Sequence, residues 1–249
     1  MPKIDLSGQT IYYDSLGKPD NPPLLLMHGW LEVGRDHLAL ANELAAGGYR
    51  VIVPDLPGYG RSTPPERTYP TDFYQRDARL MGQFLDALAI EKAHVMGFSD
   101  GGEIALLIGI TRPERCRSVV AWGATGYYAP DLGAWVRDAM PRLIPQASHR
   151  ARHPGQTIDG WQAAWIEAFT AIVAAGGDLS LSHAEDITCP LLIMVGEHDR
   201  LNPAADVQRF AERAGERAQF VFFPTVGHAI HIESPQEFLK TVLTFLKPL

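Results

Sequence analysis

A serine with the flanks of a nucleophile lies near the middle of the chain. Ser99 is the third residue of GFSDG at positions 97–101. The apolar residues 93–96 before it predict a buried strand, and residues 103–108 after it open a helix. Glycines on both sides permit a sharp strand-to-helix turn, which raises the serine hydroxyl above the end of a sheet. This arrangement predicts that Ser99 attacks a carbonyl carbon.

A serine hydroxyl is a weak nucleophile unless a base takes its proton and an acid orients that base. Two further apolar runs, residues 190–196 and 220–223, predict buried strands. Asp199 follows the first run and His228 follows the second, which is the order serine, acid, histidine expected with this type of turn. We therefore predict that Ser99, Asp199 and His228 form a catalytic triad in which His228 is the base.

The alkoxide that forms on the attacked carbonyl needs hydrogen-bond donors that are fixed in advance. One is expected to be the backbone N–H of Asp100, the residue after the nucleophile, and the other should come from a loop after an earlier strand. HGW at residues 28–30 follows the apolar run 23–27, so the Trp30 N–H is the second predicted donor. We expect the Trp30 side chain to contact substrate and His28 to bond loop backbone.

Alternating strand and helix patterns indicate how these residues are brought together. The clearest helical pattern covers residues 72–89, and residues 2–15 predict an antiparallel hairpin. Alternation of this kind implies one α/β domain with a mainly parallel sheet and helices on both faces. The remaining apolar runs that predict strands are residues 50–53 and 118–122.

A segment without a convincing strand interrupts the alternation. Residues 124–186 have helical patterning and are rich in aromatic residues, which predicts a small helical lid. Residues 1–123 and 187–249 would then form the core domain. We expect aromatic residues at this junction, Trp122 and Tyr127, to contact the substrate, although such side chains could equally pack the lid onto the core.

Composition and charge exclude several classes of partner. The net charge of −7 and the scattered basic residues argue against nucleic-acid binding, and no apolar run is long enough to span a membrane. The sequence has no signal-peptide pattern, dinucleotide-binding motif, phosphate loop or zinc spacing, so we expect a cytoplasmic enzyme without cofactor or metal. The two cysteines, Cys116 and Cys189, fit a reducing compartment, although a disulfide between them is geometrically conceivable.

Several motifs together resemble the α/β-hydrolase superfamily: HGW at 28–30, PDLPGYGRS at 54–62, GFSDG, GEHD at 196–199 and GH at 227–228. The resemblance covers nearly the whole chain outside the lid and implies an eight-stranded sheet. More narrowly, GFSDGG at 97–102 with VAWGA at 120–124 resembles the valacyclovirase family of biphenyl hydrolase-like α-amino-ester hydrolases. In that family the aspartate after the nucleophile binds the substrate's α-amine, a role implied here for Asp100.

Physical chemistry gives a separate argument about Asp100. A carboxylate beside a nucleophile is costly to desolvate unless it meets a cation or several donors. A substrate ammonium group would offset that cost. The alternative is that Asp100 turns away and bonds backbone or a buried water.

The sequence thus predicts a serine hydrolase of small carboxylic esters, with α-amino-acid esters as one possible substrate class. Cofactor-free perhydrolases, lactonases and C–C bond hydrolases use the same triad and stay open as alternatives. A non-catalytic ligand-binding protein on this fold is a third possibility, which an intact triad disfavours. We expect a small-molecule ester as the partner and a monomer or small homo-oligomer.

Overall fold

A single eight-stranded sheet forms the centre of the computed structural model, which describes residues 2–6, 8–62, 66–142 and 147–247. The strand order is β1-β2-β4-β3-β5-β6-β7-β8. β1 pairs antiparallel with β2, β2 pairs antiparallel with β4, and the other neighbouring strands are parallel. The strands are β1 (Lys3–Leu6), β2 (Gln9–Leu16), β3 (Pro23–Met27), β4 (Arg50–Pro54), β5 (Ala93–Phe98), β6 (Cys116–Trp122), β7 (Leu191–Gly196) and β8 (Ala218–Phe223).

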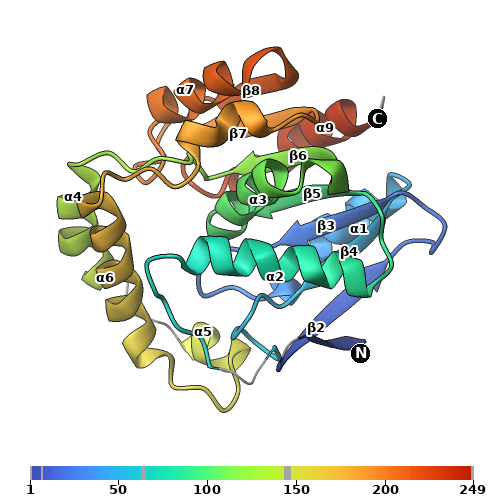
Figure 1. Ribbon diagram of the computed structural model, residues 1–249, viewed down its shortest axis with the longest axis horizontal. Helices are drawn as coiled ribbons and strands as arrows, with labels where there is room; N and C mark the ends of the chain where they lie inside the picture. Colours follow the sequence, from blue (N-terminus) through green and yellow to red (C-terminus); the bar gives the residue numbers. More distant parts are fainter. Residues whose placement is uncertain (1, 7, 63–65, 143–146, 248–249) are drawn as a thin grey trace.

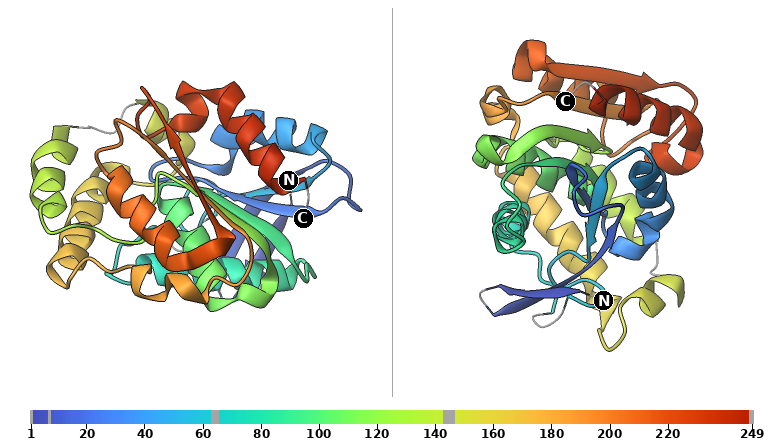
Figure 2. Two further views of the ribbon diagram at one scale, coloured as in Figure 1. Left: turned by 90° about the horizontal axis from the view of Figure 1, so that it is seen from above. Right: turned by 90° about the vertical axis from the view of Figure 1, so that its right-hand side faces the viewer.

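Helices cover both faces of this sheet, as the sequence predicts (Figures 1 and 2). One face packs against α2 (Phe73–Ala87), α3 (Asp100–Thr111) and α7 (Ala204–Ala214), and the other against α1 (Leu38–Ala46) and α9 (Pro235–Leu246). The short helix α8 (Ile230–Glu233) precedes α9. The fold expected from the sequence, a mainly parallel eight-stranded sheet between two helical layers, is confirmed.

Strand periodicity explains why the central strands are apolar throughout. In β3, Leu25 and Met27 belong to the core cluster under α2 and α3, whereas Leu24 and Leu26 belong to the cluster under α1 and α9. All four side chains are fully buried. A strand covered on both faces needs an apolar residue at every position, because successive side chains point to opposite sides.

The segment between β6 and β7 contains α4 (Leu132–Ala139), α5 (Ala147–Arg152) and α6 (Trp161–Ala174), which lie to one side of the sheet in Figure 1. Its two ends meet at Gly126. The Gly126 carbonyl accepts hydrogen bonds from the N–H groups of residues 179, 180 and 181 at 3.1, 3.0 and 3.1 Å. The Gly126 N–H donates in turn to the buried Glu103 carboxylate of α3. This is the segment predicted as a lid, and its division at residues 124 and 186 stays a prediction.

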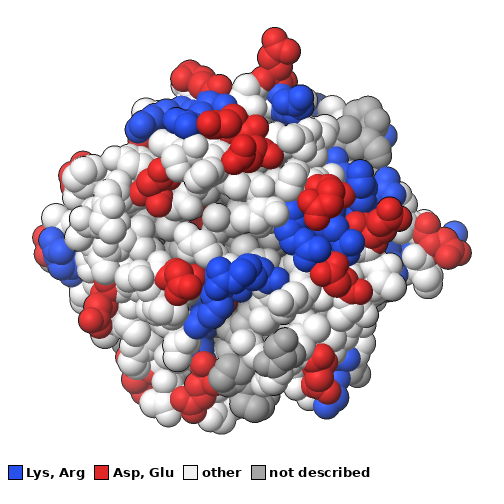
Figure 3. All heavy atoms as spheres, viewed as in Figure 1, with Lys and Arg blue, Asp and Glu red and all other residues white. Residues whose placement is uncertain are grey.

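Positive and negative groups are interspersed on the face shown in Figure 3, where Lys and Arg lie beside Asp and Glu. Within the described part of the chain, no helix combines the length and apolar character needed to cross a membrane. Cys116 and Cys189 are both buried and unbonded to one another, so the disulfide that the sequence left open is not formed.

Candidate active site

Three loops at the carboxyl ends of parallel strands bring Ser99, Asp199 and His228 together. The Ser99 hydroxyl lies 3.0 Å from Nε2 of His228, and Oδ2 of Asp199 lies 2.8 Å from Nδ1 of the same imidazole. Asp199 is buried, whereas the His228 side chain keeps 29% of its surface exposed. Because a carboxylate only accepts, the proton of neutral His228 sits on Nδ1 and leaves Nε2 free to accept the Ser99 proton.

The turn that carries Ser99 is strained, and glycines make it possible. Ser99 has φ 53° and ψ −120°, in a region that non-glycine residues rarely occupy. A Cβ atom at Gly97 would lie 2.0 Å from the Gly101 carbonyl oxygen, and a Cβ at Gly101 would lie 2.6 Å from the His28 carbonyl oxygen. The Ser99 N–H is fixed by a 2.9 Å hydrogen bond to the Trp122 carbonyl. The backbone therefore holds the hydroxyl towards His228 at some cost in local strain.

Asp199 is held in place by the residues that follow it. Its Oδ1 accepts the N–H groups of Leu201 and Asn202 at 3.0 and 3.1 Å, and its Oδ2 accepts the Asn202 side-chain amide at 3.2 Å. The neighbouring Glu197 is exposed and accepts the N–H of Thr225 instead. Asn202 was missed in the sequence. The local signal of this turn is Asp199 itself, because an Asp side chain often accepts the backbone N–H two residues on, here that of Leu201.

The two predicted oxyanion donors belong to different loops, and their placement as donors stays a prediction. Asp100 is the first residue of α3, so its N–H has no acceptor within the helix. The Trp30 N–H shares a peptide plane with the Gly29 carbonyl, which lies 2.8 Å from Nδ1 of His28. Nε2 of His28 accepts the Leu56 N–H at 2.9 Å, so Nδ1 carries the proton. Burial lowers the pKa of His28 to about 4, which keeps it neutral in this purely structural position.

The Asp100 side chain turns inward beneath aromatic residues. Oδ1 accepts the Tyr74 hydroxyl at 2.8 Å, and the Tyr74 hydroxyl lies 2.9 Å from that of Tyr128. Oδ2 is buried and makes no regular hydrogen bond to the described residues, although the nearby Trp165 indole lowers the Asp100 pKa. Burial raises the pKa of Asp100 to about 6, and the Tyr74 hydroxyl, the Arg67 guanidinium and the Trp165 indole oppose that rise. A buried carboxylate oxygen without a regular hydrogen bond is rare in folded proteins.

Aromatic residues of α6 pack against Trp30 and Tyr128. The rings of Trp30 and Trp165 lie 5.4 Å apart, and Trp165 stacks against Phe169 at 5.0 Å. Phe169 also packs on Tyr128 at 4.1 Å. Trp30 is only half-buried, so part of its surface stays accessible.

The two remaining predicted substrate contacts, Trp122 and Tyr127, differ from each other. Trp122 is fully buried in the cluster under α1 and α9, where its Nε1 donates to Nδ1 of His231 at 3.0 Å. A side chain without exposed surface on that side of the sheet offers nothing to a substrate, so Trp122 is a core residue. Tyr127 is half-buried and lies under the Arg209 guanidinium at 5.2 Å. The hydroxyl of Tyr74 contacts Asp100 directly, and that of the neighbouring Tyr128 contacts the Tyr74 hydroxyl.

No group of histidine, cysteine, aspartate or glutamate side chains suited to a metal ion occurs within residues 2–6, 8–62, 66–142 and 147–247. The contact between Ser99 and His228 allows proton transfer between the two side chains.

Comparison with known proteins agrees with the fold and the motifs. The alpha/beta hydrolase fold family matches residues 22–145, and the family described as serine aminopeptidase, S33 matches residues 163–235. The human protein named serine hydrolase BPHL is 28% identical over 98% of this chain and 86% of its own length. The 2-hydroxymuconate semialdehyde hydrolase of Pseudomonas putida is 30% identical over 90% of this chain and 86% of its own length.

Solved structures share the same architecture. A variant of the meta-cleavage product hydrolase CumD superposes with a TM-score of 0.77 at 26% identity, covering 100% of this chain and 98% of that one. The enol-lactonase from Burkholderia xenovorans LB400 superposes with a TM-score of 0.75 at 21% identity, covering 99% of this chain and 100% of that one. The chain belongs to the α/β-hydrolase family. Within that family it is similar to serine hydrolase BPHL over nearly its whole length.

Proposed function

We propose that this α/β hydrolase is a serine hydrolase that cleaves small carboxylic esters through an acyl-enzyme. The observation that carries the proposal is the continuous hydrogen-bonded row Ser99–His228–Asp199, with contacts of 3.0 and 2.8 Å. The similarity to a relative named serine hydrolase also supports it.

The reaction follows from the protonation states of these groups. Oγ of Ser99 attacks the ester carbonyl carbon while its proton moves to Nε2 of His228, and the carbonyl oxygen becomes an oxyanion facing the N–H groups of Trp30 and Asp100. His228 then gives the proton to the leaving alcohol oxygen as the C–O bond breaks. A water molecule repeats the sequence on the acyl-enzyme, which releases the acid and restores Ser99.

We further propose that the preferred esters carry a free α-amine. Oδ2 of Asp100 is buried and makes no regular hydrogen bond to the described residues, and Asp100 directly follows the nucleophile. An ammonium group beside Oδ2 would supply the missing cation within reach of a carbonyl at Ser99. The rings of Trp30 and Trp165 would shield this contact from water, and such desolvated charge pairs contribute more than exposed ones.

Hydrolysis of a C–C bond or a lactone is the second candidate. It is favoured by similarity to a relative named 2-hydroxymuconate semialdehyde hydrolase. The buried Asp100 argues against it for acidic substrates, since a substrate carboxylate next to Asp100 would be repelled.

Two measurements test the proposed function. A fluorophosphonate probe should label the wild-type protein and the Ser182→Ala variant, whose serine is exposed, but not Ser99→Ala. Ser99→Ala should also lower kcat by about 10³-fold or more. Unchanged turnover in Ser99→Ala would contradict the serine mechanism, and absence of labelling and turnover in wild type would favour a ligand-binding protein.

A panel of aminoacyl esters, simple acyl esters, lactones and vinylogous diketones then separates the substrate classes. The proposal expects the highest kcat/KM for the aminoacyl esters. A higher value for the lactones or diketones would replace it with the second candidate.

A further inference from the structure

Glu32 contacts the loop that carries the Trp30 oxyanion donor. One carboxylate oxygen, Oε2, accepts the Gly29 N–H at 2.9 Å and also lies 2.9 Å from Nε2 of His37. The backbone N–H of Glu32 donates to the Gly29 carbonyl at 3.3 Å. Glu32 therefore makes hydrogen bonds to Gly29 with both its main chain and its side chain.

This loop needs such support because its turn is strained. Residues 29–32 form a β-turn in which Leu31, at the third position, has φ 60°. A positive φ at that position is the requirement of a type II turn and normally selects glycine or asparagine. Conformations of this kind persist only where surrounding contacts over-determine them. The carbonyl of Leu31 is also fixed, since it lies 3.2 Å from Nε2 of the buried His153.

The turn lies directly against the nucleophile. A Cβ atom built on Gly29 would be 3.1 Å from Cβ of Ser99 and 3.3 Å from Oε2 of Glu32. A small rotation at Gly29 would therefore change the direction of the Trp30 N–H relative to the oxygen on the attacked carbon. The Gly29 N–H and carbonyl belong to the two peptides that flank this residue, and Glu32 and His28 hold one each.

His37 keeps the Glu32 carboxylate in this position. The His37 side chain is 1% exposed, and its ring stacks on His231 with centroids 5.3 Å apart and an interplanar angle of 19°. His231 is itself fixed by the indole N–H of Trp122 at 3.0 Å. Because a carboxylate only accepts, Nε2 of His37 carries the proton of this hydrogen bond. Burial alone would raise the pKa of Glu32, but the hydrogen bonds from His37 and Gly29 lower it to about 2, so the carboxylate stays ionised.

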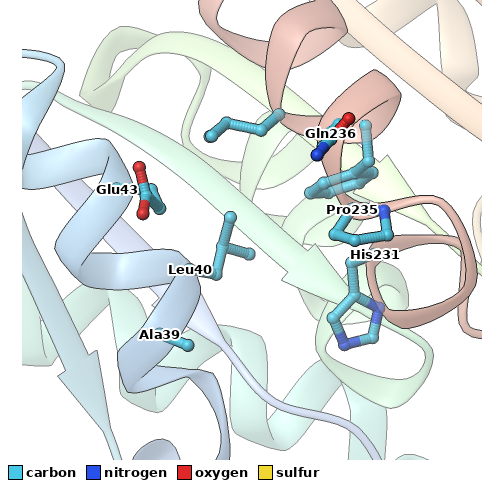
Figure 4. Close-up of a pocket in the computed structure, with 8 residues that line it drawn as sticks. Ala39, Leu40, Glu43, His231, Pro235 and Gln236 are labelled. Atoms are coloured by element: carbon cyan, nitrogen blue, oxygen red, sulfur yellow. The ribbon is translucent and has the colours of Figure 1, made fainter.

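A groove of about 350 Å³ opens on the other side of His231, between α1 and α9. Figure 4 shows His231 at one end of this groove, with Leu40 and Glu43 of α1 along its opposite wall. The stacked pair of His37 and His231 therefore lies between the groove and the Glu32 carboxylate.

We propose that Glu32, held by His37, is a positioning residue that orients the Gly29–Trp30 peptide for oxyanion stabilisation. The inference rests on the proposed serine mechanism. Glu32 touches neither the substrate nor the reacting atoms. Its effect is exerted through the direction of the Trp30 N–H, and so it should be felt in the transition state rather than in substrate binding.

The test measures turnover per active site, with sites counted by the burst of product on acylation. Glu32→Ala removes the side-chain contacts to Gly29 and His37 but keeps the Glu32 N–H. It should lower kcat by about 10- to 100-fold with KM within about threefold, somewhat less than the loss of an oxyanion donor. The rate of fluorophosphonate labelling should fall by a similar factor. Glu32→Gln keeps an oxygen for the Gly29 N–H and should recover most of the loss. Glu216→Ala, which changes an exposed glutamate, is the matched control.

His37→Phe provides an independent variant that keeps the Glu32 side chain. It should lower kcat per site by about 3- to 10-fold alone and have no further effect when combined with Glu32→Ala. If Glu32→Ala does not fold, His37→Phe and Glu32→Gln decide the matter by the same per-site measurement.

Wild-type kcat per site in Glu32→Ala, or in His37→Phe where Glu32→Ala is insoluble, would overturn the inference. A rise in KM without a fall in kcat would do the same, because it would indicate a substrate-binding role. Failure of the serine mechanism would be seen separately. An active Ser99→Ala variant would contradict that mechanism, whatever the effect of the Glu32 substitutions.

Discussion

The Tyr74 hydroxyl donates to Oδ1 of Asp100 at 2.8 Å and leaves Oδ2 of the same carboxylate without a regular hydrogen bond to the described residues. One oxygen is thus occupied by the protein, and the proposed contact to a substrate amine would fall to the other. Since burial raises the pKa of Asp100 to about 6, the charge of this proposed site changes within a range where hydrolases are readily assayed.

The ratio of kcat/KM for an α-amino ester to that for the matching neutral ester should depend on pH. Asp100 carries its charge only above its pKa, so the ratio should rise as pH increases through about 6. It should fall again above about 8, where a free α-amino group loses its proton. Any ionisation that affects both substrates equally cancels in the ratio. In Asp100→Asn, which keeps the backbone N–H, the rise near pH 6 should vanish. A ratio that is flat in the wild type would contradict amine recognition by Asp100.

Replacing Tyr74 by phenylalanine should shift this titration. The Tyr74 hydrogen bond opposes the effect of burial on Asp100, so its loss should raise the Asp100 pKa and move the rise in the ratio to higher pH. At pH 7 the amino ester should lose about 3- to 10-fold in kcat/KM. Tyr128→Phe removes a hydroxyl that contacts Tyr74 and should have a smaller effect. Equal midpoints in Tyr74→Phe and wild type would show that this hydroxyl does not tune Asp100.

The identity of the acid can be tested with two isosteric changes. Asp199→Asn should lower kcat by about 10³–10⁴-fold, because an amide no longer stabilises the tautomer and the cation of His228. Glu197→Gln should stay within about twofold of wild type, since Glu197 is exposed and its carboxylate accepts only the Thr225 N–H among the described residues. The reverse result, an active Asp199→Asn and an inactive Glu197→Gln, would move the acid to Glu197.

The turn around Ser99 should tolerate no side chain at Gly97. A Cβ there would lie 2.0 Å from the Gly101 carbonyl oxygen, so Gly97→Ala must displace the backbone of α3. We expect a loss of more than about 3 kcal/mol in the free energy of unfolding, measured by urea denaturation. Gly160→Ala has open space at its Cβ and should change stability by less than about 0.5 kcal/mol. Similar stabilities for the two variants would show that the turn relaxes at little cost.

The sequence predicts the parts of the fold and site that depend on local patterns. Apolar runs predict the strands of the parallel sheet, and short motifs after them predict Ser99, Asp199 and His228. The structure brings these three residues together. Helix α2 was expected over residues 72–89 and is observed at Phe73–Ala87.

Contacts between segments that are far apart in the sequence could not be predicted from local patterns. Tyr74 and Asp100 are separated by 26 residues, and nothing in the local sequence of α2 indicates that a tyrosine hydroxyl reaches the nucleophile loop. Glu32 likewise acquires its role only when the chain folds the turn back on Gly29. Trp122 differs, because a signal was present: strand alternation places it with Val120 on the α1/α9 side.

The two ends of the segment between β6 and β7 are joined by backbone hydrogen bonds at Gly126 and between Tyr128 and Gly177, which has a consequence for engineering. Since residues 179–181 return to Gly126, the α4–α6 region can be regarded as an interchangeable cassette on an unchanged scaffold. Exchanging it for a shorter or longer insert would alter the loop-closure entropy by only about 0.6 kcal/mol for each doubling of length. Grafts spliced between these hydrogen-bonded ends should therefore vary the surroundings of Ser99 without rebuilding the sheet.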